Sequence, residues 1–103
     1  MGFDHLNIDD VEENHGLKFL RDPLNAEKLG LTVIDRDKFE GMQHNHAEND
    51  HEEIYLLIEG DASMYVDGDE IEMREGDAIR VDPEMDRKIH SENGLLMVIA
   101  GAP

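Results

Sequence analysis

Cysteine is absent from the 103-residue sequence, and its absence removes several kinds of chemistry at once. Disulfide bonds, thiolate metal ligands and cysteine nucleophiles are all excluded. No apolar run approaches the length of a transmembrane helix. The first ten residues have neither a basic start nor an apolar segment, so we expect no signal peptide and a soluble cytoplasmic protein.

Basic residues are scarce: 9 Lys and Arg stand against 26 Asp and Glu, which gives a formal net charge of −17. Such a charge repels nucleic acid and anionic membranes, so we expect neither as a partner. The same acidity is typical of proteins from a salty cytoplasm, although an ordinary acidic domain that is very soluble would show it as well. A chain of this length is expected to form one domain.

Short segments rich in β-forming residues follow one another from residue 31 onward, separated by Gly, Pro and Asp. They predict strands at 31–35, 43–46, 53–59, 62–66, 70–73, 78–81, 87–90 and 95–100, with a loop at 35–41. Asp67-Gly68 predicts a tight hairpin, and the wholly apolar segment 95–100 predicts a strand buried on both faces. The pattern indicates an all-β barrel or sandwich over 31–103, preceded by an arm at 1–30 that packs on the barrel or on a partner subunit.

Three of the six histidines lie between residues 41 and 60, beside a pair of glutamates. On an extended strand side chains alternate between faces, so His44 and His46 point the same way. Glu53 and Tyr55 share a face by the same rule, and His51 joins them if the strand begins that early. Two imidazoles and a carboxylate suit a divalent metal of borderline ligand preference.

The spacing of these residues resembles the first motif of the cupin family, in which His-x-His precedes a Glu and six residues separate that Glu from a Gly. His44-Asn45-His46, Glu53 and Gly60 match this motif. A second motif is similar mainly in its spacing: Gly76-Asp77 match its start, and Arg87 occupies the position of the family's third metal-binding His. The sequence of residues 76–84, GDAIRVDPE, and the acidic composition especially resemble those of small cupins from haloarchaea.

The resemblance implies a double-stranded β-helix, or jelly roll, in a protein that pairs as a homodimer through sheet edges and terminal strands. It also implies a divalent transition metal (Mn, Fe, Ni or Zn) that serves the binding or conversion of a small molecule. The family's ligands are three His and one Glu, of which this chain offers His44, His46 and Glu53. No general base stands out, so no reaction is predicted.

Arg87 leaves several alternatives open, because a guanidinium beside a dication is unfavourable unless an anion lies between them. Water can complete the metal's shell, or His51 can turn inward and supply the missing ligand. Without a metal, Arg87 and the two His of the motif can hold an anionic metabolite in a non-catalytic sensor. Arg87 can also form a salt bridge with one of the many carboxylates, in a barrel that has lost its site.

Overall fold

The chain folds into two antiparallel sheets, which confirms the predicted all-β class. The computed structural model describes residues 2–48 and 50–102, and within these residues the only helical element is the 3-10 turn η1 (Ile8–Asp10). The strands are β1 (Lys18–Phe19), β2 (Gly30–Arg36), β3 (Phe39–Glu40), β4 (Glu52–Gly60), β5 (Ala62–Val66), β6 (Asp69–Met73), β7 (Ala78–Val81), β8 (Arg87–Ser91) and β9 (Leu95–Ala102). Within the described ranges, no helix is long and apolar enough to cross a membrane.

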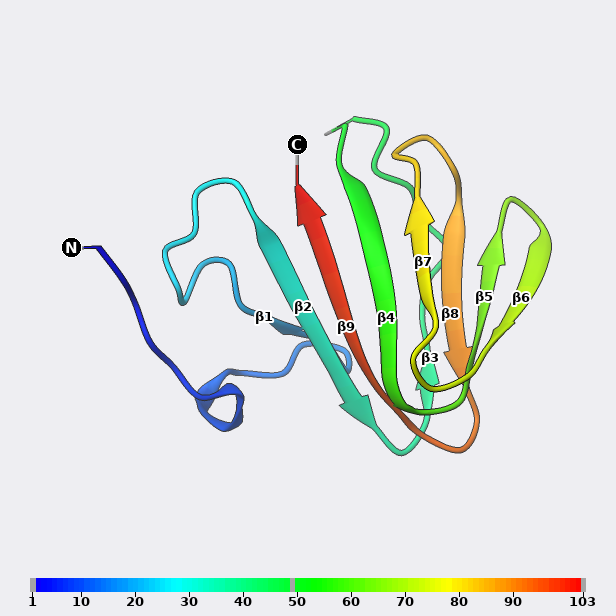
Figure 1. The fold of residues 1–103 in the computed structure, drawn as a ribbon, viewed down its shortest axis with the longest axis horizontal. Coiled ribbons are helices and arrows are strands. Elements are labelled where there is room, and N and C mark those ends of the chain that lie inside the picture. Colours follow the sequence, from blue (N-terminus) through cyan, green and yellow to red (C-terminus); the bar gives the residue numbers. More distant parts are fainter. Residues whose placement is uncertain (1, 49, 103) are drawn as a thin grey trace.

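Sheet 1 has the strand order β1-β2-β9-β4-β7, and sheet 2 has the order β3-β8-β5-β6 (Figure 1). Strands that are neighbours in a sheet are often far apart in the sequence, as β2 and β9 are, so the chain passes repeatedly between the two layers. This arrangement is the expected jelly roll. The predicted Asp67-Gly68 hairpin joins β5 to β6, and both residues have the positive φ, 46° and 88°, that a type I′ turn needs.

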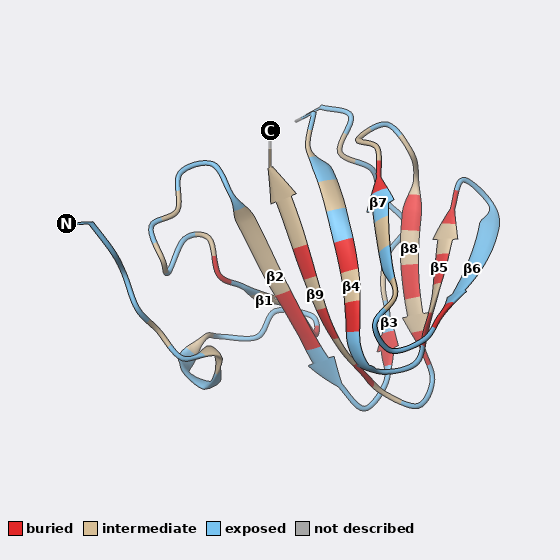
Figure 2. Cartoon of the chain, viewed as in Figure 1, coloured by how far each residue is buried: buried red, intermediate tan, exposed pale blue. Residues whose placement is uncertain are grey.

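The core lies between the sheets, where the inward side chains of β4, β5, β8 and β9 meet. Tyr55, Leu57, Met64 and Met97 are at most 1% exposed. Burial alternates along these strands, as Figure 2 shows for β8 and β9. The apolar period of two in the sequence therefore places one face of each strand in the core.

Three local predictions were wrong. Residues 43–46 form no strand and pair with β8 only through an isolated bridge between His44 and Arg87. Where the chain leaves the ladder, the Asn45 side chain accepts a hydrogen bond from the Ala47 backbone and donates another to Asp86. The predicted loop 35–41 contains the short strand β3. The segment 95–100, predicted to be buried on both faces, lies in β9, which buries one face and leaves the other half-buried.

The N-terminal arm extends beyond the β1 edge of sheet 1 and joins that sheet through β1 (Figure 1). A tight turn at His15-Gly16 folds it back, with φ values of 52° and 87° and reciprocal backbone hydrogen bonds of 2.8 Å between Asn14 and Leu17. Glycine suits this position, because a φ of 87° strains other residues and a Cβ would lie 3.0 Å from the ring of Phe39. The turn therefore brings the chain next to β1, at the edge of sheet 1, into contact with Phe39 of sheet 2.

Candidate metal centre

Glu53 and Arg87 form an ion pair that joins the two sheets. Glu53 points inward from β4 and Arg87 points inward from β8, and the Arg87 Nη1 to Glu53 Oε1 distance is 3.1 Å. The Arg87 side chain is 0% exposed, and its other nitrogens donate to the carbonyls of Met85 (2.9 Å) and Asp82 (2.6 Å). Of the alternatives stated for Arg87, the salt bridge with a carboxylate is therefore the one that this geometry matches. Facing an anion in the cavity would require this network to rearrange.

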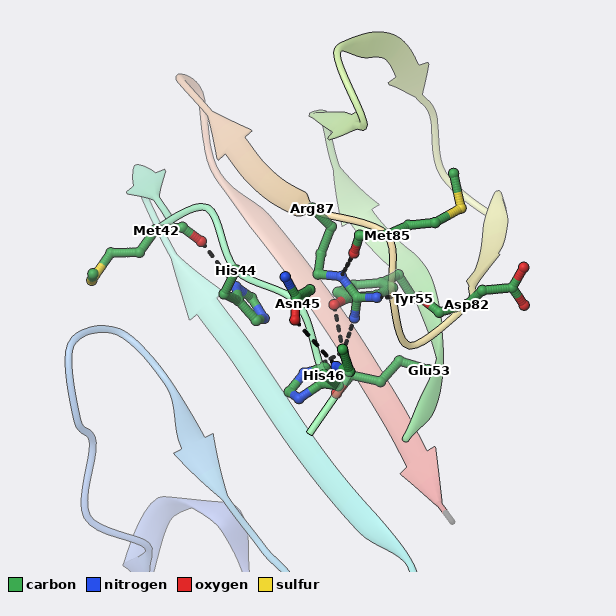
Figure 3. A network of polar contacts seen from close by, with 10 residues as sticks. Met42, His44, Asn45, His46, Glu53, Tyr55, Asp82, Met85 and Arg87 are labelled. Carbon is green, nitrogen blue, oxygen red and sulfur yellow. Dashed lines mark hydrogen bonds and ion pairs between the residues drawn. The ribbon is translucent and has the colours of Figure 1, made fainter. Parts of the chain in front are cut away.

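Two more groups converge on the same Glu53 oxygen, as Figure 3 shows. The Tyr55 hydroxyl donates to Oε1 at 2.5 Å, and His46 Nε2 lies 3.1 Å from it. Burial, reinforced by the nearby Glu53 carboxylate, raises the pKa of Tyr55 well above its ordinary value, so the phenol remains a donor at neutral pH. Burial also lowers the pKa of His46, against the opposing effect of Glu53, and this favours the neutral imidazole that metals bind.

His44 is oriented for ligation by its own backbone neighbour. Its Nδ1 lies 2.9 Å from the Met42 carbonyl, which can only accept, so Nδ1 carries the proton and Nε2 keeps the free lone pair. Backbone hydrogen bonds in both directions with Arg87 hold His44 beside the end of β8. The rings of His44 and His46 meet edge to face, with centroids 5.1 Å apart.

The structure brings three of the four predicted metal ligands together. Donor atoms of His44, His46 and Glu53 all lie within 4.8 Å of one another. His51 lies just before β4 and does not belong to this group, although its ring centroid is 6.1 Å from that of His46. It borders the cluster without completing it.

Two contributors to the centre were not predicted. Tyr55 was placed on the face of Glu53, and that signal could have suggested a hydrogen bond to the carboxylate. Gly101 on β9 gave no signal, although a Cβ there would lie 3.0 Å from Glu53 Cγ and 3.3 Å from Oε2. The absence of a side chain at Gly101 therefore provides the space that Glu53 occupies.

A cavity of about 460 Å³ opens beside the cluster, between the two sheets. His44, His46, Glu53 and Tyr55 line it, and its other walls are mainly apolar: Leu17, Phe19, Phe39, Met42, Ile89 and Ile99. A larger hollow of about 720 Å³ lies on the outer face of sheet 2. There Glu40 already pairs with Lys88 (3.2 Å) and His90 (2.9 Å), so we place the site at the inner cavity.

Comparison with known proteins decides the family. Residues 32–101 match the model of the cupin domain. The chain belongs to the cupin family. No curated protein matches the sequence.

Solved structures share the fold at low sequence identity. A cupin from Bacteroides fragilis superposes with a TM-score of 0.81 at 20% identity, over 99% of this chain and 85% of that one. An RmlC-like cupin from Shewanella frigidimarina gives 0.76 at 21% identity, over 100% and 95% of the two chains. KdgF from a Halomonas species gives 0.65 at 14% identity, over 89% and 84%.

Cupins commonly bind a divalent metal, and the residues present fit one. His44 offers an oriented Nε2, His46 is biased toward its neutral form, and Glu53 supplies a carboxylate. The hydrogen bonds and ion pairs of Glu53 within the described residues all fall on Oε1. Oε2 is therefore available, and imidazole with carboxylate suits Mn, Fe, Ni or Zn.

Proposed function

We propose that this cupin binds a divalent transition metal (Mn, Fe, Ni or Zn) through His44, His46 and Glu53 and uses it to bind or act on a small molecule. The position of Glu53 supports the proposal most directly. Its carboxylate lies between the Arg87 guanidinium and the imidazole of His46, with 3.1 Å to each. The anion that must separate a guanidinium from a dication is thus supplied by the protein itself.

The metal would act as a Lewis acid that polarises an oxygen of the bound molecule. The chain's own residues do the rest. Arg87 and Tyr55 fix the Glu53 carboxylate, and the Met42 carbonyl fixes the ring of His44. Water would complete the ligand set, and the imidazole of His51 lies close by, with its ring centroid 6.1 Å from that of His46. The sensor alternative, with an anion on Arg87, is less well supported because that side chain is wholly buried.

Elemental analysis of protein purified without chelators tests this function. We expect about one transition metal per chain, lost in the double variant His44→Ala/His46→Ala. His90→Ala is the matched control, since His90 pairs with Glu40 on the outer face of sheet 2, and it should keep the metal. A wild-type protein that is empty and refuses added Mn, Fe, Ni and Zn would contradict the proposal.

We also propose that the protein is a homodimer that pairs through the outer face of sheet 1. Asp35, Glu52 and Arg80 lie at the margins of this face, and the paired positions between them are apolar: Leu31, Ile54, Leu56, Val98 and Ala100. None of these five is acidic in a chain with 26 acidic residues, and Ile54 is 46% exposed. A second copy carries the same patch, so a two-fold axis would bury both at once.

Sedimentation analysis of Ile54→Asp tests the dimer. This variant should become monomeric, whereas Ser63→Asp, on the outer face of sheet 2, should stay dimeric. A wild-type monomer would refute the interface.

The net charge of −17 supports two further parts of the proposal. Nucleic acid and anionic membranes are not expected as partners, because both repel such a chain. Adaptation to high salt is expected as well, since counterions screen the repulsion among the carboxylates. The melting temperature should therefore rise steadily with KCl concentration, and a melting temperature that salt leaves unchanged would argue against adaptation.

A further inference from the structure

The cavity beside the His44, His46 and Glu53 cluster has a polar end and an apolar length. Strand register places four inward residues in one row across sheet 1: Phe19 pairs with Thr32, Thr32 with Ile99, and Ile99 with Tyr55. The row begins at Phe19, which is 48% exposed, and ends at Tyr55, which is 1% exposed and bonded to Glu53. This row is therefore apolar from Phe19 to Ile99 except for one threonine hydroxyl, whereas His15 and Glu40 add polar groups elsewhere on the cavity lining.

The opposite wall of the cavity, which sheet 2 forms, is apolar as well. Phe39 of β3 and Ile89 of β8 line the cavity there, and both are buried. The His15-Gly16 turn packs on Phe39, and it brings Leu17 and Phe19 to the rim. The N-terminal arm is thus a wall of the cavity, and not only a cover for the edge of the sheet.

Positive charge is missing along this path. The described residues that line the cavity include no Lys or Arg. Arg87 is 0% exposed and holds Glu53, and the Glu40 carboxylate is paired with Lys88 and His90. A phosphate or a polyhydroxylated chain would lose its water along the walls and meet few partners there.

We propose that the ligand is a small molecule with an apolar body and one oxygen-bearing polar group. The body lies along the row Phe19, Thr32 and Ile99, between the sheets. The polar group, an anionic or metal-binding oxygen, lies at His44, His46 and Glu53. The polar end rests on the metal function proposed above, whereas the apolar body depends on the cavity walls alone.

A series of uncharged primary alkanols from butanol to octanol tests whether the cavity binds an apolar body. Binding is followed by NMR titration of the methyl groups of Ile89 and Ile99, in metal-loaded protein and in protein stripped with EDTA. Burying each added methylene should tighten binding about fourfold in both forms, until the cavity is filled. Ile54 on the outer face of sheet 1 reports separately any binding at that surface.

The polar end is tested by the carboxylates of the same chain lengths. Hexanoate should bind the metal-loaded protein more tightly than hexanol, and this gain should disappear with EDTA. Gluconate, a polyhydroxylated carboxylate with the same six carbons, and glucose 6-phosphate should bind more weakly than hexanoate. If hexanoate binds the metal-loaded protein no more tightly than hexanol while the alkanol series behaves as expected, the metal function is contradicted and the apolar body of the ligand is still supported.

Phe19→Ala locates the outer wall. Phe19 lies on a short edge strand and is half exposed, so the variant should fold and should lose affinity for octanol more than for butanol. Lys18→Ala, the neighbouring residue on the opposite face of β1, is the matched control and should change neither. An affinity that does not depend on chain length at Ile89 and Ile99, or gluconate binding above hexanoate, would overturn the proposal even in a metal-loaded protein.

Discussion

Glu53 and Glu40 have nearly the same partners in different surroundings. Each carboxylate meets one cationic side chain and one imidazole: Arg87 and His46 for Glu53, Lys88 and His90 for Glu40. Glu53 joins the two sheets across the core, where Arg87 is 0% exposed. Glu40 bonds to its neighbours within sheet 2, and its own side chain is 55% exposed.

The difference shows that surroundings decide what such a cluster can do. At Glu40 water solvates the carboxylate and the Lys88 ammonium, so these two charges attract each other only weakly. At Glu53 the charges cannot be left unpaired, because their burial is costly. The buried Arg87 therefore holds the Glu53 carboxylate in place at the end of a largely apolar cavity, where a metal or a polar group can use the remaining donor atoms.

The largest effect should come from breaking the buried pair. Arg87→Ala leaves Glu53 without its counter-ion and removes the donors to two carbonyls, so we expect a loss of about 3–5 kcal/mol in the free energy of unfolding. Lys88→Ala, the next residue on the same strand but facing outward, should cost no more than about 1 kcal/mol. Urea denaturation of both variants measures the contrast, and equal losses would refute it.

Replacing Arg87 and Glu53 together tests whether the cost of the single variants comes from an unpaired buried charge. Arg87→Met with Glu53→Leu removes both charges together and keeps apolar bulk, so the double variant should be more stable than either single variant. The same double variant should have lost any metal site, which elemental analysis can check. If its loss equals the sum of the single losses, Arg87 and Glu53 are not coupled.

Local signals allowed much of the fold to be predicted from sequence. Alternating apolar residues and the Asp67-Gly68 turn located most strands, since both signals depend on neighbours in the chain. β3 (Phe39–Glu40) was missed because it has only two residues and exists through its pairing with β8, about 50 residues later. Residues 43–46 show the opposite case, because an alternating pattern there formed no ladder.

The candidate site was predictable where its residues are close in sequence. The resemblance to cupins selected His44, His46 and Glu53. The partner of Arg87 could not be chosen among 26 acidic residues, because that choice depends on which strands face each other across the core. The space beside Glu53 that Gly101 leaves open likewise follows from the register of β4 and β9, with no local pattern to indicate it.

The two clusters should also respond to pH in different ranges, and His46 gives the larger of these effects. Burial lowers its pKa below the ordinary value of 6.5, so the unfolded chain binds the proton more readily than the folded one. Stability should therefore fall as the pH drops below 6.5. In EDTA, denaturation midpoints between pH 7.5 and 5.5 should fall more for the wild type than for His46→Gln, and parallel falls would contradict this.

Glu40→Gln should give the smallest effect. The hydrogen bond from Lys88, more than that from His90, lowers the pKa of Glu40 below its ordinary value of 4.5. A lowered carboxyl pKa stabilises the folded state above pH 4.5, and this contribution is lost as the pH falls through the folded value. The wild type should therefore melt only slightly higher than Glu40→Gln at neutral pH, and the two should converge in acid. Because the cluster is exposed, 1 M salt should also remove the difference. A difference that survives salt would mean that Glu40 is as shielded as Glu53, and the contrast between the two clusters would then fail.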